Sequence, residues 1–157
     1  MPKIRYIKGD ATRPTVPGNK IIAHICNDQG KWGAGFVLAV SSRWKQPEES
    51  YRECPEEWRL GVVQVVPVED QISVANMIAQ HGTQRMYGSF GSGAQIPPIR
   101  YGALRACLAT VNDIAYRTNA TIHMPRIGCG LAGGRWDEVE AIIKDVISVD
   151  VYVYDLK

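Results

Sequence analysis

The last third of the sequence alternates between two hydrophobic periodicities, and this alternation constrains the fold more than any other feature. Apolar residues recur at helical spacing over residues 104–115 and again over 136–147. Each helical segment is followed by a short apolar run typical of a strand, at 120–125 and 149–156. Helices that alternate with strands usually connect parallel strands, so we predict a mixed, partly parallel sheet with helices on both faces.

The first part of the sequence supplies further elements of the same kind. Strand-like runs lie at 3–9, 20–26, 61–68 and 72–80, a helical segment at 36–44, and a helix with a connection at 47–58. The runs before Glu69 and after Asp70 predict a hairpin, and the stretch from His81 to Pro98 has no periodicity and indicates a long loop. With 36–44 and 47–58 counted as one helical region, the predicted order is β-β-α-β-β-α-β-α-β.

The composition indicates one globular domain over residues 1–157. With 45% hydrophobic residues, a chain of this length can bury one core. The net charge of +2 comes from scattered basic residues, so binding to nucleic acid is not indicated. No stretch approaches the roughly 18 apolar residues of a membrane span, and no leader is evident. We therefore expect a cytoplasmic monomer that does not bind membranes.

The cysteines give no sign of a metal or redox site. Cys26, Cys54, Cys107 and Cys129 are far apart and form neither a C-x-x-C pair nor a zinc pattern. We expect buried free thiols, no metal and no cofactor.

Two glycine-rich turns lie between a strand-like run and a helical segment, NDQGKWGAG at 27–35 and RIGCGLAGGRW at 126–136. The second contains G-x-G-x-x-G, but only one helix and one strand follow it, so a standard dinucleotide-binding fold does not fit. Glycines let a backbone approach a ligand closely, and helix N-termini receive phosphate. Two such turns predict a diphosphate held from both sides, although tight packing of helix on strand also explains one or two of the glycines.

Four motifs in a fixed order resemble one known family. KGDAT at 8–12, IIAHICNDQGKWGAGFVLAV at 21–40, MPRIGCGLAGGRW at 124–136 and VYVYDL at 151–156 resemble the macrodomains, which bind ADP-ribose in a three-layer α/β/α fold. The chain is most similar to the class that includes an ADP-ribose-glutamate hydrolase and the yeast ADP-ribose 1''-phosphate phosphatases. The resemblance covers the whole chain, with 81–98 matched least. It implies ADP-ribose or an ADP-ribosylated protein as the partner.

The resemblance also implies which residues contact the ligand at the adenine and ribose ends. Asp10 would accept a hydrogen bond from the adenine amino group, with Ala11 beside it, and Tyr154 would pack near the adenine. Asn27 would bind hydroxyls of the distal ribose, the sugar that carries the scissile bond. From the residues alone, Asp10 and Asn27 are equally typical of turns, and Tyr154 of a strand packed in the core.

The glycine turns would hold the rest of the ligand. Gly33 and Gly35 would approach the distal ribose and phosphate, and Trp32 would either cover that ribose or cap the loop. The residues implied around the diphosphate are Gly128, Cys129, Gly130, Leu131, Ala132 and Gly133.

The catalytic residues are less well marked. The resembling glutamate hydrolases carry an aspartate in the second glycine turn and a lysine after the hairpin; this chain has Ala132 at the first position and Gln80 or His81 at the second. A covalent route through lysine is therefore not expected. Hydrolysis would instead depend on strain of the distal ribose and an aligned water.

The remaining polar residues near the turns leave two candidates. We name Asn27 and Asp28 as candidate catalytic residues, although Asp28 is equally typical of a solvent-facing turn. His24 and His123 alternate within apolar strands, and we expect both to be core histidines.

These features favour a hydrolase of ADP-ribosyl ester linkages, such as modified glutamate or aspartate or O-acetyl-ADP-ribose. Two alternatives remain open. A non-catalytic reader of ADP-ribose is favoured by Ala132 and the missing lysine, and an ADP-ribose 1''-phosphate phosphatase by the second class that the chain resembles.

Overall fold

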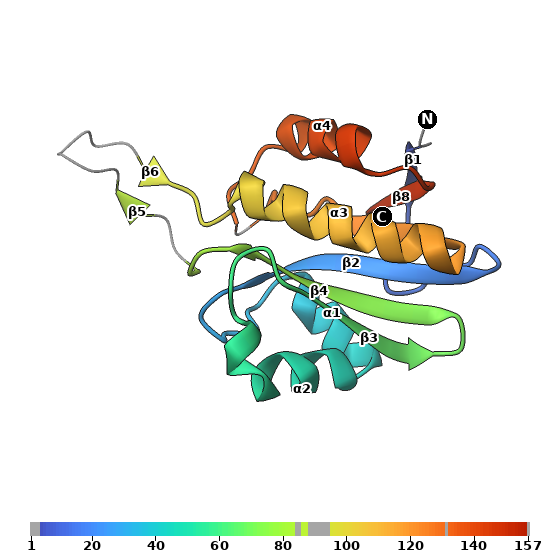
Figure 1. Cartoon of the computed structure of the whole chain (residues 1–157), viewed down its shortest axis with the longest axis horizontal. Helices are drawn as coiled ribbons and strands as arrows, with labels where there is room; N and C mark the ends of the chain where they lie inside the picture. Colours follow the sequence, from blue (N-terminus) through green and yellow to red (C-terminus); the bar gives the residue numbers. More distant parts are fainter. Residues whose placement is uncertain (1–3, 84–85, 88–94, 131, 157) are drawn as a thin grey trace.

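A computed structural model describes residues 4–83, 86–87, 95–130 and 132–156. One six-stranded sheet lies between two pairs of helices (Figure 1). The elements in chain order are β1 (Ile4–Lys8), β2 (Asn19–Asn27), α1 (Phe36–Arg43), α2 (Gln46–Glu53), the 3-10 turn η1 (Pro55–Glu57), β3 (Val63–Glu69), β4 (Ile72–Gln80), β5 (Met86–Tyr87), β6 (Gln95–Ile96), α3 (Tyr101–Thr118), β7 (Ala120–Pro125), α4 (Trp136–Val146) and β8 (Val151–Asp155).

The sheet is mixed, as predicted. Its strand order is β1-β8-β7-β2-β4-β3, and every neighbouring pair is parallel except β3 and β4, which form an antiparallel hairpin. Because the parallel strands run in one direction, the carboxyl ends of β8, β7, β2 and β4 meet at one edge of the sheet. Loops that follow these strands are thereby brought together, which is where ligands bind in open α/β sheets.

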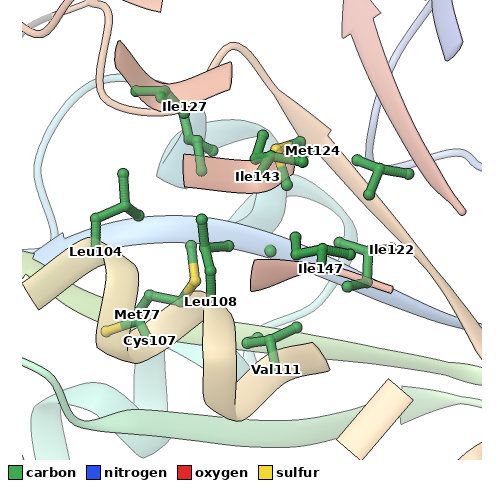
Figure 2. Close-up of a cluster of buried hydrophobic side chains, with 14 of the residues drawn as sticks. Met77, Leu104, Cys107, Leu108, Val111, Ile122, Met124, Ile127, Ile143 and Ile147 are labelled. Carbon is green, nitrogen blue, oxygen red and sulfur yellow. The ribbon is translucent and has the colours of Figure 1, made fainter. Parts of the chain in front are cut away.

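The two faces of the sheet are covered by different helices. Helices α3 and α4 cover one face and enclose the larger core, whereas α1 and α2 cover the other (Figure 1). Figure 2 shows side chains of the larger core, where Leu104 and Leu108 of α3 lie among residues of the sheet and of α4. Both leucines are fully buried, as the helical periodicity predicted. On α4, Ile142 is buried as well.

The structure adds detail that the sequence pattern did not provide. The predicted loop 81–98 contains the short antiparallel pair β5 and β6, while 84–85 and 88–94 lie outside the described residues. All four cysteines are free; Cys26 and Cys107 are buried, but Cys54 and Cys129 are only partly so. No helix in the described part of the chain is long and apolar enough to cross a membrane.

Candidate functional site

A cavity of about 270 Å³ opens at the edge where the parallel strands end. It is walled by the loop between β2 and α1, the end of β4, and the loop between β7 and α4. The residues implied by the family resemblance that line this cavity are Asn27, Trp32, Gly33, Gly35, Gly128, Gly130 and Ala132. Both glycine turns therefore face one hollow, as their position after strands suggested.

The amino end of α1 opens onto this cavity. Gly33, Gly35 and Phe36 are among the lining residues, and α1 begins at Phe36 with Gly35 as its N-cap. This end has no side-chain cap and no acidic residue in its first turn. The first N–H groups of a helix have no partner within the helix and carry partial positive charge, so this wall of the cavity favours an anion. Helix α4, in contrast, carries Asp137 and Glu138 in its first turn.

The glycines of the second turn fall into two groups. A Cβ on Gly128, at φ +76°, would lie 2.4 Å from Cδ1 of Ile99, and a Cβ on Gly134 would lie 2.5 Å from the carbonyl oxygen of Gly128. Packing explains these two glycines. A Cβ on Gly130 or on Gly35 would meet nothing within 4 Å, so packing does not require glycine there.

Asn27 holds the first glycine turn together. Its Oδ1 accepts hydrogen bonds from the backbone N–H groups of Gln29 (2.9 Å) and Lys31 (3.3 Å) and lies 2.9 Å from the hydroxyl of Tyr51. Its Nδ2 donates one hydrogen to the carbonyl of Lys31, and the second amide hydrogen has no partner among the described residues. The turn role that the sequence left open is therefore the role seen here, and contact with a ribose stays a prediction.

Three aromatic rings, those of Trp32, His24 and Tyr51, pack together next to the same turn. Trp32 is only 5% exposed and donates its indole N–H to Oγ of Ser41 (2.7 Å). Its ring contacts those of His24 and Tyr51, with centroids 5.5 and 5.6 Å apart. Trp32 also lines the cavity, so both roles predicted for it, covering the distal ribose or capping the loop, stay predictions. Burial lowers the pKa of His24 to about 4, so this histidine is a neutral core residue, as expected.

The residues assigned to the adenine lie outside the cavity, at the ends of β1 and β8. Oδ1 of Asp10 accepts bonds from the N–H (2.8 Å) and hydroxyl (2.7 Å) of Thr12, the turn geometry that competed with an adenine role. Ala11 is buried. Tyr154 is also buried, with its hydroxyl 2.8 Å from Nδ1 of His123, and burial raises the pKa of that phenol to about 12. His123 is fully buried, as predicted.

The other residues that the resemblance assigns to the second turn are not seen to line the cavity. Cys129 and Gly133 are not among the residues that line the cavity, and Leu131 lies outside the described residues. Arg126 does line it, which the sequence analysis missed although this arginine begins the quoted motif. Its guanidinium is held by the carboxylate of Asp155, at 2.6 and 3.1 Å.

Asp28 is less exposed than the sequence suggested, because it pairs with His81. Its Oδ2 lies 2.7 Å from Nδ1 of His81, and its Oδ1 accepts the N–H of Gly82 at 2.9 Å. Burial alone would raise the pKa of this carboxyl, but the hydrogen bonds from His81 and Gly82 outweigh it, and the net pKa is lowered. The sequence analysis named both residues without joining them, since β2 and β4 are not consecutive strands.

No family model matches the chain, but solved structures do. A protein of unknown function from Bacteroides thetaiotaomicron is 51% identical with a TM-score of 0.86, over 97% of this chain and 98% of that one. A macrodomain protein from Streptomyces coelicolor is 46% identical with a TM-score of 0.82, over 98% of this chain and 99% of that one.

Curated relatives are more distant. An ADP-ribose 1''-phosphate phosphatase from Lodderomyces elongisporus is 26% identical over 96% of this chain and 97% of its own length. Chromodomain-helicase-DNA-binding protein 1-like from Danio rerio is 32% identical, but the chain spans only 14% of that protein, and 17% of its mouse counterpart. Identity of 46% over nearly the full length of the Streptomyces coelicolor protein shows that this chain belongs to the macrodomain family.

Proposed function

We propose that this macrodomain binds ADP-ribose along the carboxyl edge of its sheet and hydrolyses ADP-ribosyl ester linkages. The observation that carries the proposal is the uncapped amino end of α1, which opens onto the cavity without an acidic residue in its first turn. Such an end binds phosphate through its N–H groups and its dipole. The open space at Gly35 and Gly130 supplies room for a diphosphate beside it.

The strand order supports one direction for this ligand along the sheet. The adenine lies at the ends of β1 and β8, near Asp10 and Tyr154, and the diphosphate lies between the two glycine turns. Oδ2 of Asp10 is not used in the turn with Thr12; it lies 3.8 Å from Nε of Arg13 and would also accept the adenine amino group. From β8 through β7 and β2 to β4 is three strand spacings, or about 14 Å. The distal ribose therefore lies beyond the diphosphate, towards the ends of β2 and β4.

The ester linkage is the finer part of the proposal. Asn27 contacts the distal ribose through its remaining amide hydrogen, and Asp28 contributes at the same end of the site. Ala132 stands where the resembling hydrolases have an aspartate, so attack by water depends on the groups beside β2 and β4.

A second candidate is removal of the phosphate from ADP-ribose 1''-phosphate. It is supported by the full-length similarity to the Lodderomyces elongisporus protein that carries that name. The same cavity would serve, with a phosphate rather than a carboxylate attached to the distal ribose.

Binding and turnover test the proposal separately. ADP-ribose should bind in calorimetry and raise the melting temperature, and AMP should bind much more weakly because it lacks the second phosphate and the distal ribose. Equal binding of ADP-ribose and AMP would contradict a diphosphate held between the two glycine turns. Release of ADP-ribose from glutamate-modified protein, O-acetyl-ADP-ribose and ADP-ribose 1''-phosphate then identifies the linkage. If the protein binds ADP-ribose but releases it from none of these substrates, the non-catalytic reader of ADP-ribose is favoured.

A further inference from the structure

The pair formed by Asp28 and His81 differs from the other ion pairs of the molecule. In the other ion pairs between described residues, the acidic side chains are 29 to 67% exposed, whereas the side chain of Asp28 is only 14% exposed. The imidazole of His81 is 42% exposed. A largely buried carboxylate beside a solvent-facing imidazole is the arrangement of a general base and its orienting group.

Both oxygens of the carboxylate have a partner, and this determines which nitrogen of the imidazole carries the proton. One oxygen accepts the N–H of Gly82 and the other faces Nδ1 of His81. An ionised carboxylate has no proton to donate, so Nδ1 carries the proton and donates it. In the neutral imidazole the lone pair is then on Nε2, for which no hydrogen-bond partner is found among the described residues.

Neither residue is among those that line the cavity, but the backbone holds both next to residues that do. The N–H of Asp28 donates to the carbonyl of Gln80 (3.0 Å), and the N–H of His81 donates to the carbonyl of Pro98 (2.8 Å). Asp28 directly follows Asn27, which lines the cavity, and His81 lies between two further lining residues, Gln80 and Thr83. The pair thus sits where β2 and β4 end, which is the distal-ribose end of the proposed ligand.

We propose that His81 is the general base of the hydrolysis and that Asp28 is its positioning residue, an inference that rests on the proposed function. Nε2 of His81 takes a proton from water as the water oxygen bonds to the anomeric carbon of the distal ribose. The bond from that carbon to the ester oxygen breaks, and its electron pair leaves with the carboxylate. The imidazolium then releases the proton to solvent. The products are ADP-ribose, which keeps the second water hydrogen on its new hydroxyl, and the free side-chain carboxylate.

The experiment compares single-turnover release of ADP-ribose from glutamate-modified protein with the dissociation constant for ADP-ribose. His81→Ala should slow release at least 100-fold, the usual contribution of a general base, and should change the dissociation constant less than about three-fold. Added imidazole should restore part of the rate, because the variant lacks only the base. A purely structural histidine would not respond to imidazole.

Asp28→Asn tests the positioning role in an almost isosteric side chain. The amide oxygen still accepts the N–H of Gly82, but the amide nitrogen now donates towards Nδ1 of His81 and moves the imidazole proton to Nε2. Release should slow at least ten-fold with ADP-ribose affinity unchanged. Asp145→Asn is the matched control, because Asp145 pairs with Arg105 on an exposed surface, and it should release ADP-ribose at the wild-type rate.

The outcomes separate the two proposals. If the wild-type protein releases ADP-ribose and His81→Ala does so within ten-fold of its rate, the general-base assignment is overturned and the proposed function stands. Loss of affinity equal to the loss of rate, without rescue by imidazole, also overturns it. If the wild-type protein binds ADP-ribose but releases none from any substrate, the hydrolase proposal fails and the catalytic role of His81 fails with it.

Discussion

A charge placed at Gly130 tests whether the second glycine turn faces a diphosphate. A side chain at this position enters open space, since a Cβ there would meet nothing within 4 Å, and the backbone φ is not in the left-handed region. Gly130→Glu should therefore fold normally while it places a carboxylate in the cavity. Gly130→Gln has almost the same shape and no charge, so the difference between the two variants isolates electrostatic repulsion.

The size of the effect follows from Coulomb's law. A unit charge about 6 Å from one phosphate charge, at an effective dielectric constant of about 20, is disfavoured by about 3 kcal/mol. The dissociation constant for ADP-ribose should therefore be about 100-fold larger for Gly130→Glu than for Gly130→Gln. The ratio should shrink as salt is added, because the cavity is open to solvent and ions screen the repulsion.

The assay is calorimetric titration of ADP-ribose at low and high salt, with melting temperatures measured in parallel. Gly128→Ala is the folding control: its Cβ would lie 2.4 Å from Ile99 at φ +76°, and a cost of about 2 kcal/mol should lower the melting temperature by roughly 4 to 8 °C. The two Gly130 variants should melt near the wild type. Equal affinity of the Glu and Gln variants would refute a phosphate beside Gly130.

Two further predictions concern stability. Asn27→Ala removes the acceptor for the N–H groups of Gln29 and Lys31 and should lower the free energy of unfolding by about 2 to 3 kcal/mol in urea; a loss below about 0.5 kcal/mol would contradict the structural role. His24 and His123 have their pKa lowered to about 4, chiefly by burial, but titrate near 6.5 when unfolded. Between about pH 6.5 and 4 the unfolded chain binds the extra protons, so stability should fall with decreasing pH, by about 1.4 kcal/mol per unit for each histidine. His123→Gln should halve this slope, and an unchanged slope would show that burial does not hold His123 neutral.

The architecture was largely predictable from local pattern. The alternation of helical and strand periodicity after residue 101 reflects which side of each element is buried, and that is a property of neighbouring residues in the chain. The two glycine turns were placed correctly at strand ends for the same reason. The pair β5 and β6 was missed because two-residue strands carry no periodicity.

The details of the site depend on strand order, which periodicity does not encode. The sequence indicated that Asp28 and His81 each follow a strand, but their hydrogen bond exists because β2 and β4 are neighbours in the sheet. Likewise, only the packed structure separates Gly128, which Ile99 crowds, from Gly130, which faces open space. The sequence by itself determined the elements and the turns that follow them, because those depend on adjacent residues. The tertiary structure alone decided which turns meet and which side chains are left for a ligand, because those contacts join residues about 30 to 55 positions apart in the chain.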